Sequence, residues 1–370
     1  MRSRRADAPA RPPLPKGFGV IWTTVAIDLI GFGIVLPILP RYAEEFGATP
    51  IQIGFLVASF SFAQMLAAPV MGKLSDRYGR KPVLLFSLVG TAIGSLLTGL
   101  AGALPMLFLG RLIDGASGAS VSVAQASVTD IATPEERPRL LGLLGAAFGV
   151  GFVLGPAIGA LAALGGSHVP FFVAAAISAV NALVAVKRLP ETRRAGIHAT
   201  VTGPVDDAEV PTVDPDAGPV DRTGLNRLAL AAFMAVTAFA GFEATFSLLT
   251  GDRFGLSISQ TGLAFVLIGV LLVGVQGGLV GRANAALGED VTIRIGMGLD
   301  VCGLLLLVPD GGWLTLVPGV AMLTVGQGLL TPTLVSAASH RAGAERGRYL
   351  GWQQSLRYLA RLVEPDIKRG

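Results

Sequence analysis

The chain has 370 residues, of which 52% are hydrophobic and only 15% are charged. Soluble domains normally carry about 25% charged residues, so the composition indicates an integral membrane protein and argues against a soluble one. The net charge of +4 could suit an acidic partner, but the positions of the basic residues give it another explanation.

Ten apolar segments are each long enough to cross a bilayer as a helix, which takes about 20 residues. They lie near residues 18–40, 51–72, 82–102, 105–131, 140–163, 168–188, 227–250, 257–281, 291–308 and 313–338. Apolar residues run all round each segment, as lipid-embedded helices require, and the alternating short strands of a membrane barrel are absent from the sequence. The sequence therefore predicts an all-α polytopic membrane protein.

Basic residues concentrate in alternate connections between these segments. With the N-terminus inside, the outside connections contain only Arg41 and Arg253 as basic residues. This asymmetry predicts a cytoplasmic N-terminus in the plasma (inner) membrane, and it makes nucleic acid a poor partner. The N-terminal segment lacks the apolar region and cleavage site of a signal peptide. The single cysteine, Cys302, cannot form an internal disulfide, and the sequence shows no cluster of metal ligands.

A polar segment from Glu191 to Arg222, rich in Pro, Asp and Gly, predicts a flexible cytoplasmic linker. It divides the chain into an N-terminal six-helix bundle at 1–190, a linker at 191–225 and a second bundle at 226–370. The two parts repeat one another at a constant offset of 209 residues. Matching pairs include Gly72 and Gly281, Gly79 and Gly288, Glu136 and Glu345, Arg137 and Arg346, and Pro156 and Pro365.

The repeat also predicts an incomplete second bundle, because residue 370 corresponds to Leu161 of the first copy. We expect ten full spans plus a partial eleventh. Internal repeats are the usual construction of secondary transporters, and their substrate sites lie near the bilayer midplane at the repeat interface.

The connection between the second and third spans, GKLSDRYGRKP, combines glycine with dense charge. Gly72 and Gly79 permit a tight turn and close helix approach. Lys73, Arg80 and Lys81 favour the inside face. Asp76 suits a latch between the bundles, since its repeat equivalent is Ala285; a simple topology anchor is the alternative.

This connection resembles the signature of the major facilitator superfamily, G-x-L-x-D-R-x-G-R-K/R, and the resemblance covers most of the chain. It implies a fold of two six-helix bundles that transports a small molecule by alternating access. It also implies that Asp76 contacts the inside end of the eleventh helix, at residues 346–351. The gating residues would be Gly72, Asp76, Arg77, Gly79, Arg80 and Lys81.

The fifth span contains a second signature, G-x8-G-x3-G-P-x2-G. Its residues are Gly142, Gly151, Gly155, Pro156 and Gly159. The pattern resembles the antiporter motif of proton-driven drug exporters, although Ala160 stands where that family has a final glycine. General packing of small residues between helices is the alternative.

The first span contains Asp28 in the pattern D-x-x-G-x-G-x-x-x-P-x-x-P. This pattern resembles the first helix of twelve-span drug:proton antiporters, including the tetracycline exporters. A carboxylate inside a membrane span marks a functional site by default, which makes Asp28 a candidate proton carrier. A structural hydrogen bond to a neighbouring helix is the alternative.

Further ionisable residues lie in other spans. Arg111 and Asp114 in the fourth span are three residues apart and can neutralise each other. The resemblance implies a role in proton transfer for the arginine, and a purely structural ion pair is the alternative. Glu243 in the seventh span is a candidate for cation recognition or simply faces water, and Asp300 in the ninth span ranks lower.

The tenth span contains Gly326, Gly328 and Pro332, which suit a flexing helix, and Gln276 and Gln327 are candidate substrate contacts. The sequence thus predicts a monomeric exporter that exchanges a drug-like or tetracycline-like molecule for protons. Its partners are substrate, protons and lipid, and it needs a proton gradient but no metal or other cofactor. A sugar or metabolite exporter, an inactive remnant and a membrane receptor are the alternatives. The sequence has no Walker loop, metal-ligand cluster or nucleophile elbow, so we expect no enzyme.

Overall fold

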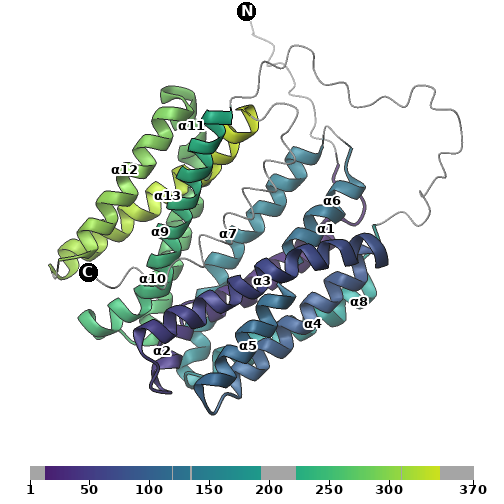
Figure 1. Cartoon of the computed structure of the whole chain (residues 1–370), viewed down its shortest axis with the longest axis horizontal. Coiled ribbons are helices and arrows are strands. Elements are labelled where there is room, and N and C mark those ends of the chain that lie inside the picture. Colours follow the sequence, from purple (N-terminus) through teal and green to yellow (C-terminus); the bar gives the residue numbers. More distant parts are fainter. Residues whose placement is uncertain (1–12, 119, 134–135, 193–221, 310, 342–370) are drawn as a thin grey trace, which may run out of the picture.

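The computed structural model describes residues 13–118, 120–133, 136–192, 222–309 and 311–341, and every regular element in these ranges is a helix (Figure 1). The first group comprises α1 (Phe18–Val35), α2 (Leu39–Glu44), α3 (Pro50–Tyr78), α4 (Arg80–Gly99), α5 (Leu104–Ser117), α6 (Ser120–Ile131), α7 (Arg137–Ala162) and α8 (Val169–Arg188). The second comprises α9 (Arg222–Phe254), α10 (Ile258–Gly274), α11 (Val280–Leu287), α12 (Glu289–Leu307) and α13 (Trp313–Arg341). A 3₁₀ turn at Ala163–Gly165 follows α7, and a π-helical turn at Val275–Leu279 joins α10 to α11.

Within the described residues, eight helical segments are long and apolar enough to cross a membrane. The two other predicted spans are built differently. The span predicted at 105–131 is interrupted, because α5 ends at Ser117 and α6 begins at Ser120. The span predicted at 291–308 corresponds to α12, which carries the charged residues Asp290, Arg294 and Asp300.

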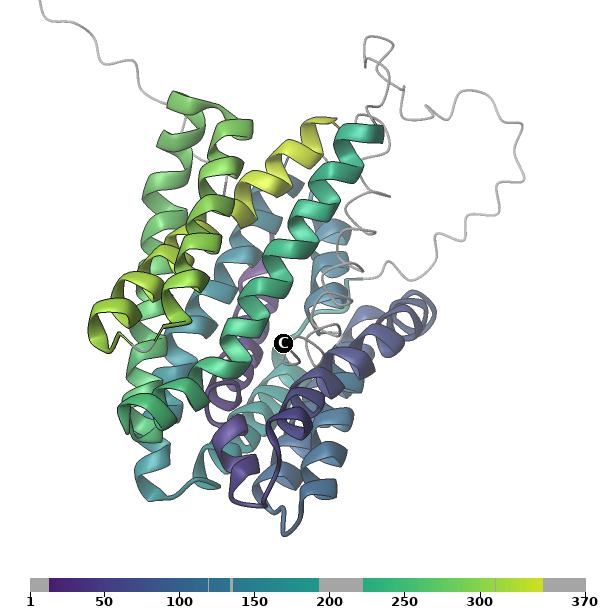
Figure 2. The ribbon, with the colours of Figure 1, turned by 60° about the vertical axis from the view of Figure 1, so that its left-hand side comes forward.

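Helices α1–α8 form a first bundle and α9–α13 a second, and the two groups stand side by side in Figures 1 and 2. In the first bundle α1 packs on α7 and α8, while α4 packs on α5 and α8; in the second, α12 packs on α13. The predicted partial eleventh helix lies outside the described residues. The helices run between two ends of the molecule. The Gly79 end contains the turn between α3 and α4, and the Arg41 end contains α2.

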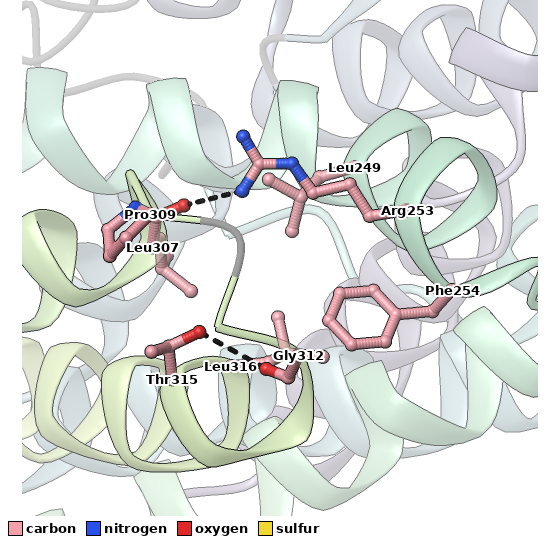
Figure 3. Close-up of a pocket in the computed structure, with 8 residues that line it drawn as sticks. All are labelled: Leu249, Arg253, Phe254, Leu307, Pro309, Gly312, Thr315 and Leu316. Carbon is pink, nitrogen blue, oxygen red and sulfur yellow. Dashed lines mark hydrogen bonds between the residues drawn. The ribbon is translucent and has the colours of Figure 1, made fainter.

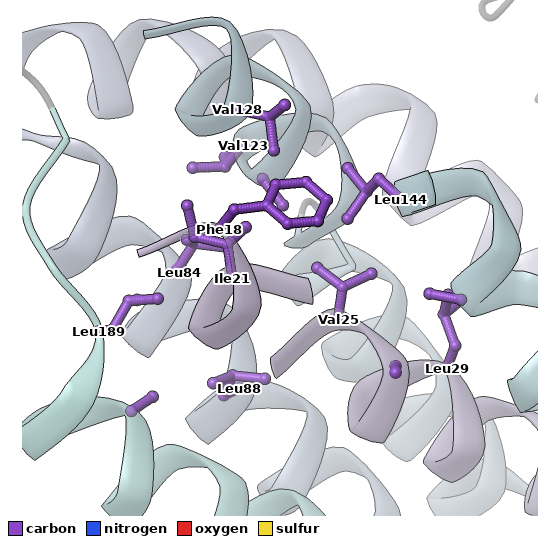
Figure 4. Close-up of a cluster of buried hydrophobic side chains, with 14 of the residues drawn as sticks. Phe18, Ile21, Val25, Leu29, Leu84, Leu88, Val123, Val128, Leu144 and Leu189 are labelled. Carbon is purple, nitrogen blue, oxygen red and sulfur yellow. The ribbon is translucent and has the colours of Figure 1, made fainter. Parts of the chain in front are cut away.

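Apolar side chains fill the first bundle near its Gly79 end (Figure 4). Phe18, Ile21 and Val25 of α1 meet Leu84 of α4 and Leu144 of α7. Other large apolar side chains are exposed on the helix surfaces, among them Leu183, Leu267 and Leu314. Because lipid tails are as apolar as leucine, the close fit between helices, rather than burial from water, holds such a bundle together.

Two glycines confirm the repeat predicted from the sequence. Gly79 alone joins α3 to α4 with φ 106° and ψ 161°, and Gly288 alone joins α11 to α12 with φ 80° and ψ 162°. This backbone region is essentially restricted to glycine. The same sharp turn therefore recurs 209 residues later in the second bundle.

The repeat contains a one-residue irregularity at the π-helical turn. The second helix of each bundle begins with a capping box, at Thr49 in α3 and at Ser257 in α10. These caps lie 208 residues apart, one fewer than Gly79 and Gly288. A π turn closes over one more residue than an α turn, so Val275–Leu279 accommodates the extra residue.

The turn between α12 and α13 is held by α9 (Figure 3). The Nη1 group of Arg253 donates to the carbonyl of Leu307 at 3.1 Å, and Nη2 donates to the carbonyl of Val308 at 3.3 Å. The last carbonyls of a helix have no partner within the helix, so Arg253 satisfies those of α12. The ring of Phe254 packs 4.8 Å from that of Trp313, between centroids.

We predict that Gly288→Ala lowers the stability of the purified protein by about 1–3 kcal/mol, the cost of forcing a side chain into this backbone region. Gly79→Ala should be more damaging, because its Cβ would lie 2.5 Å from Glu191 Oε2. Gly72→Ala is the matched control, since no described atom lies within 4 Å of its Cβ. Thermal unfolding in detergent measures the effect, and equal stability of the Gly288 and Gly72 variants would contradict the turn argument.

Candidate functional site

A pocket lies between the two bundles, lined by α1, α3 and α5 on one side and α9 on the other. Its residues are Phe32, Leu36, Val57, Phe60, Ser61, Arg111, Ala240, Glu243 and Ala244. Arg111 and Glu243 are 3% and 4% exposed. The structure therefore brings two of the predicted residues, a base from the first bundle and an acid from the second, to the same pocket.

Arg111 is held by contacts on two sides. Its Nη1 group donates to Asp114 Oδ2 at 2.9 Å, as the three-residue spacing predicted. Its guanidinium lies 4.4 Å from the centre of the Phe60 ring, within range of a cation–π interaction. Both members of the ion pair are buried, so removing either would leave an uncompensated charge.

Asp28 belongs to the same group of charges. Ser120, the first residue of α6, donates its hydroxyl to Asp28 Oδ2 at 2.5 Å, and Oδ1 has no hydrogen-bond partner among the described residues. The Asp28 carboxylate also interacts electrostatically with Asp114. Two acids and one base therefore meet inside the first bundle, which leaves one negative charge unbalanced when all three are ionised.

Helix α1, which carries Asp28, is seated on the glycines of the fifth span. A Cβ on Gly151 would lie 2.7 Å from the Leu29 carbonyl oxygen, and one on Gly159 would lie 3.0 Å from the Ile34 carbonyl oxygen. At Gly155 the Cβ would lie 2.6 Å from Gly33 Cα. Three glycines of the predicted motif thus let α1 and α7 touch backbone to backbone. No described atom lies within 4 Å of a Cβ on the fourth, Gly142.

The second bundle packs on α7 through glycines of α10. A Cβ on Gly262 would lie 2.7 Å from the Ala160 Cβ, and one on Gly269 would lie 2.7 Å from the Phe152 carbonyl oxygen. Nearer the Gly79 end, no described atom lies within 4 Å of a Cβ on Gly277 or Gly281. The glycines of α10 that approach α7 closely are therefore Gly262 and Gly269.

At the Arg41 end, a polar contact joins the bundles. Arg41 of α2 donates to the carbonyl of Leu256, which follows α9. Partial burial raises the pKa of the Glu44 carboxyl above its ordinary value, the nearby Asp252 charge raises it further, and Arg41 opposes both. Glu44 and Asp252 come from opposite bundles, so protonation of Glu44 in acid removes a repulsion between them and favours this contact.

The predicted gating residues lie at the Gly79 end, away from the pocket. Arg80 donates from Nη1 to Asp76 Oδ1 at 2.7 Å and from Nε to Asp130 Oδ2 at 2.9 Å. The Glu191 carboxylate accepts the backbone N–H groups of Arg80 and Lys81 at 2.9 and 3.1 Å. An anion is favoured at this position, the N-terminus of α4. The predicted contact of Asp76 with the eleventh helix lies outside the described residues.

Comparison with known proteins agrees with this architecture. Residues 21–365 match the family model described as Major Facilitator Superfamily. The chain belongs to the major facilitator superfamily.

Relatives within the superfamily cover most of the chain. It is 30% identical over 366 residues to the tetracycline resistance protein, class H, of Pasteurella multocida, covering 95% of this chain and 87% of the relative. It is 33% identical over 333 residues to the class B protein of Escherichia coli, covering 87% and 80%. The crystal structure of the human organic anion transporter MFSD10 (TETRAN) matches with a TM-score of 0.69 and 28% identity, covering 96% of this chain and 93% of that chain.

The remaining predicted residues of this superfamily member do not line the described pocket between the bundles. Gln276 is exposed on the π-helical turn, Gln327 is buried within α13, and Pro332 follows five residues later. Asp300 of α12 is buried, and its carboxylate lies directly against Gly326 of α13. Sequence reasoning missed Ser120, Asp130 and Glu191, because their partners come from distant helices.

We predict that Gly155→Ala impairs transport strongly, because the added Cβ would force α1 away from α7 and displace Asp28. Gly142→Ala is the control within the same motif. The rate of substrate uptake into inside-out vesicles, normalised to protein level, measures the difference. Equal rates for the two variants would show that close approach of α1 and α7 is not needed.

Asp76→Asn should reduce transport more than Lys73→Gln, while changing the free energy of unfolding by less than about 1 kcal/mol. The Asp76 side chain is 67% exposed, so its pair with Arg80 adds little stability, and its effect would come from gating. Lys73 is exposed on the same helix turn. If both variants lost the same transport activity, or if Lys73→Gln lost more, the connection would only anchor the topology and Asp76 would have no gating role.

Proposed function

We propose that the protein is a proton-coupled exporter that exchanges a drug-like, tetracycline-like molecule for protons by alternating access. The observation that carries this proposal is the group formed by Asp28, Asp114 and Arg111, with Arg111 lining the pocket between the bundles. The tetracycline resistance proteins among its relatives support the substrate class.

The charge balance of this group explains why a proton would be coupled to transport. When all three side chains are ionised, one negative charge remains in a medium where unpaired charge is costly. A proton on Asp28 neutralises these three side chains, and a positively charged group of a bound substrate would do the same. Proton and substrate would therefore compete, which is the requirement for exchanging one for the other.

Alternating access requires that protonation stabilise one arrangement of the bundles more than the other. Asp28 lies on α1, which packs on α7, and α7 in turn contacts α10 of the second bundle. A change of charge at Asp28 would thus act on the helix pair that connects the bundles.

The distribution of basic residues supports a cytoplasmic N-terminus and an inner-membrane location. In that orientation the Gly79 end faces the cytoplasm and the Arg41 end faces outward. The hydrogen bond from Arg41 to Leu256 and the α7–α10 glycine contacts would then close the outer side. Opening outward would require breaking that hydrogen bond.

We predict that Asp28→Asn abolishes tetracycline accumulation driven by a proton gradient in inside-out vesicles. Counterflow of labelled against unlabelled tetracycline, which needs no proton exchange, should persist. Asp290→Asn, the same change at an exposed position in the first turn of α12, is the control and should keep both activities. Gradient-driven accumulation at the unmodified rate by Asp28→Asn would exclude Asp28 as the proton carrier.

A further inference from the structure

The interruption of the fourth span has a definite geometry. Gly118, after the end of α5, has φ −70° and ψ 25°, and its N–H bonds to the Gly115 carbonyl at 3.0 Å. The α-helical register is therefore lost between Ser117 and Ser120. Backbone groups freed by such a break must find other partners, since the bilayer core supplies no water.

A side chain of α3 supplies one of these partners. Gln64 Nε2 donates to the Gly118 carbonyl oxygen at 2.5 Å. A Cβ on Gly118 would lie 2.8 Å from this nitrogen, and one on Gly115 would strike the backbone of Phe60 on the same helix. Helix α3 thus lies directly against the break, at a distance that only glycine permits.

The same break places the donor of Asp28. Ser120 lies two residues beyond Gly118 and donates its hydroxyl to Asp28 Oδ2. Phe60, four residues before Gln64, contacts the guanidinium of Arg111. One face of α3 therefore contacts both the arginine of the charged group and the backbone that carries the serine.

We propose that Gln64 is a positioning residue for proton exchange: it fixes the interruption of the fourth span so that Ser120 can donate to Asp28. This inference rests on the proposed function, in which Asp28 carries the proton. Helix α3 also ends in the gating connection at Asp76 and Gly79. Movement of α3 would thereby alter the hydrogen bonding of Asp28 without direct contact.

The hydrogen bond from Ser120 affects how readily Asp28 releases its proton. A hydroxyl donor stabilises the ionised carboxylate. Without Gln64, Ser120 loses its alignment, and Asp28 releases its proton only at higher pH. The expected shift is about one pH unit, the size associated with losing one hydrogen bond to a charged group.

The test is a pH titration of the protonated-carboxyl infrared band of the purified full chain, which needs no substrate. The band of Asp28 is identified by its loss in Asp28→Asn. Gln64→Leu and Ser120→Ala should each move its midpoint upward by about one pH unit. The double variant should move it no further, because both changes remove the same hydrogen bond. Gln125→Leu, the same substitution in α6, is the control and should leave the midpoint unchanged.

Gln64→Met, which is similar in length and lacks a donor, replaces Gln64→Leu if that variant does not fold, and Ser120→Thr should restore the midpoint. Gln64 has no positioning role if Ser120→Ala shifts the midpoint and Gln64→Met does not, or if the two shifts add in the double variant. Either result would contradict the inference and leave the proposed function intact. If Asp28→Asn loses no infrared band and still couples substrate uptake to protons, the proposed function and the inference are both wrong.

Discussion

The first bundle depends on keeping ionised side chains paired where no water is available. An isolated charge in the bilayer core costs several kcal/mol, so Arg111, Asp114 and Asp28 must share their contacts. Arg111 donates to Asp114 and lies against the ring of Phe60, and one carboxylate oxygen of Asp28 accepts from Ser120. When all three are ionised the group lacks one positive charge, which under the proposed function a proton or a positively charged group of the substrate supplies.

Comparing the two repeats shows which charged residues occur in one bundle only. At the offset of 209 residues, the positions equivalent to Arg111 and Asp114 are Val320 and Leu323, and the equivalent of Asp76 is Ala285. The two bundles share their turns, but the pair of Arg111 and Asp114 and the acid at Asp76 occur only in the first. The second bundle contributes an acid of its own to the pocket, Glu243 on α9.

The sequence was sufficient to predict features that depend on residues close together in the chain or on the repeat. Apolar length predicted the eight spans found in the described residues. The offset of 209 predicted the paired turns at Gly79 and Gly288, and the three-residue spacing predicted the pair of Arg111 and Asp114. The interruption at Gly118 was not predicted, and the partner of the Gly118 carbonyl, Gln64, lies 54 residues away in the sequence. Ser120, Asp130 and Glu191 were missed for the same reason: serines and acids at helix ends are common, and only tertiary contacts select among them.

If proton and substrate compete for the charged group around Asp28, substrate binding should release protons from the protein. Purified protein in weakly buffered detergent solution is mixed with tetracycline, and a pH indicator follows the protons released. The unmodified protein and Asp76→Asn, a substitution at the exposed Gly79 end, should both release protons, and Asp28→Asn should release none. Release by Asp28→Asn equal to that of the unmodified protein, or none from any of the three while tetracycline binds, would contradict this competition.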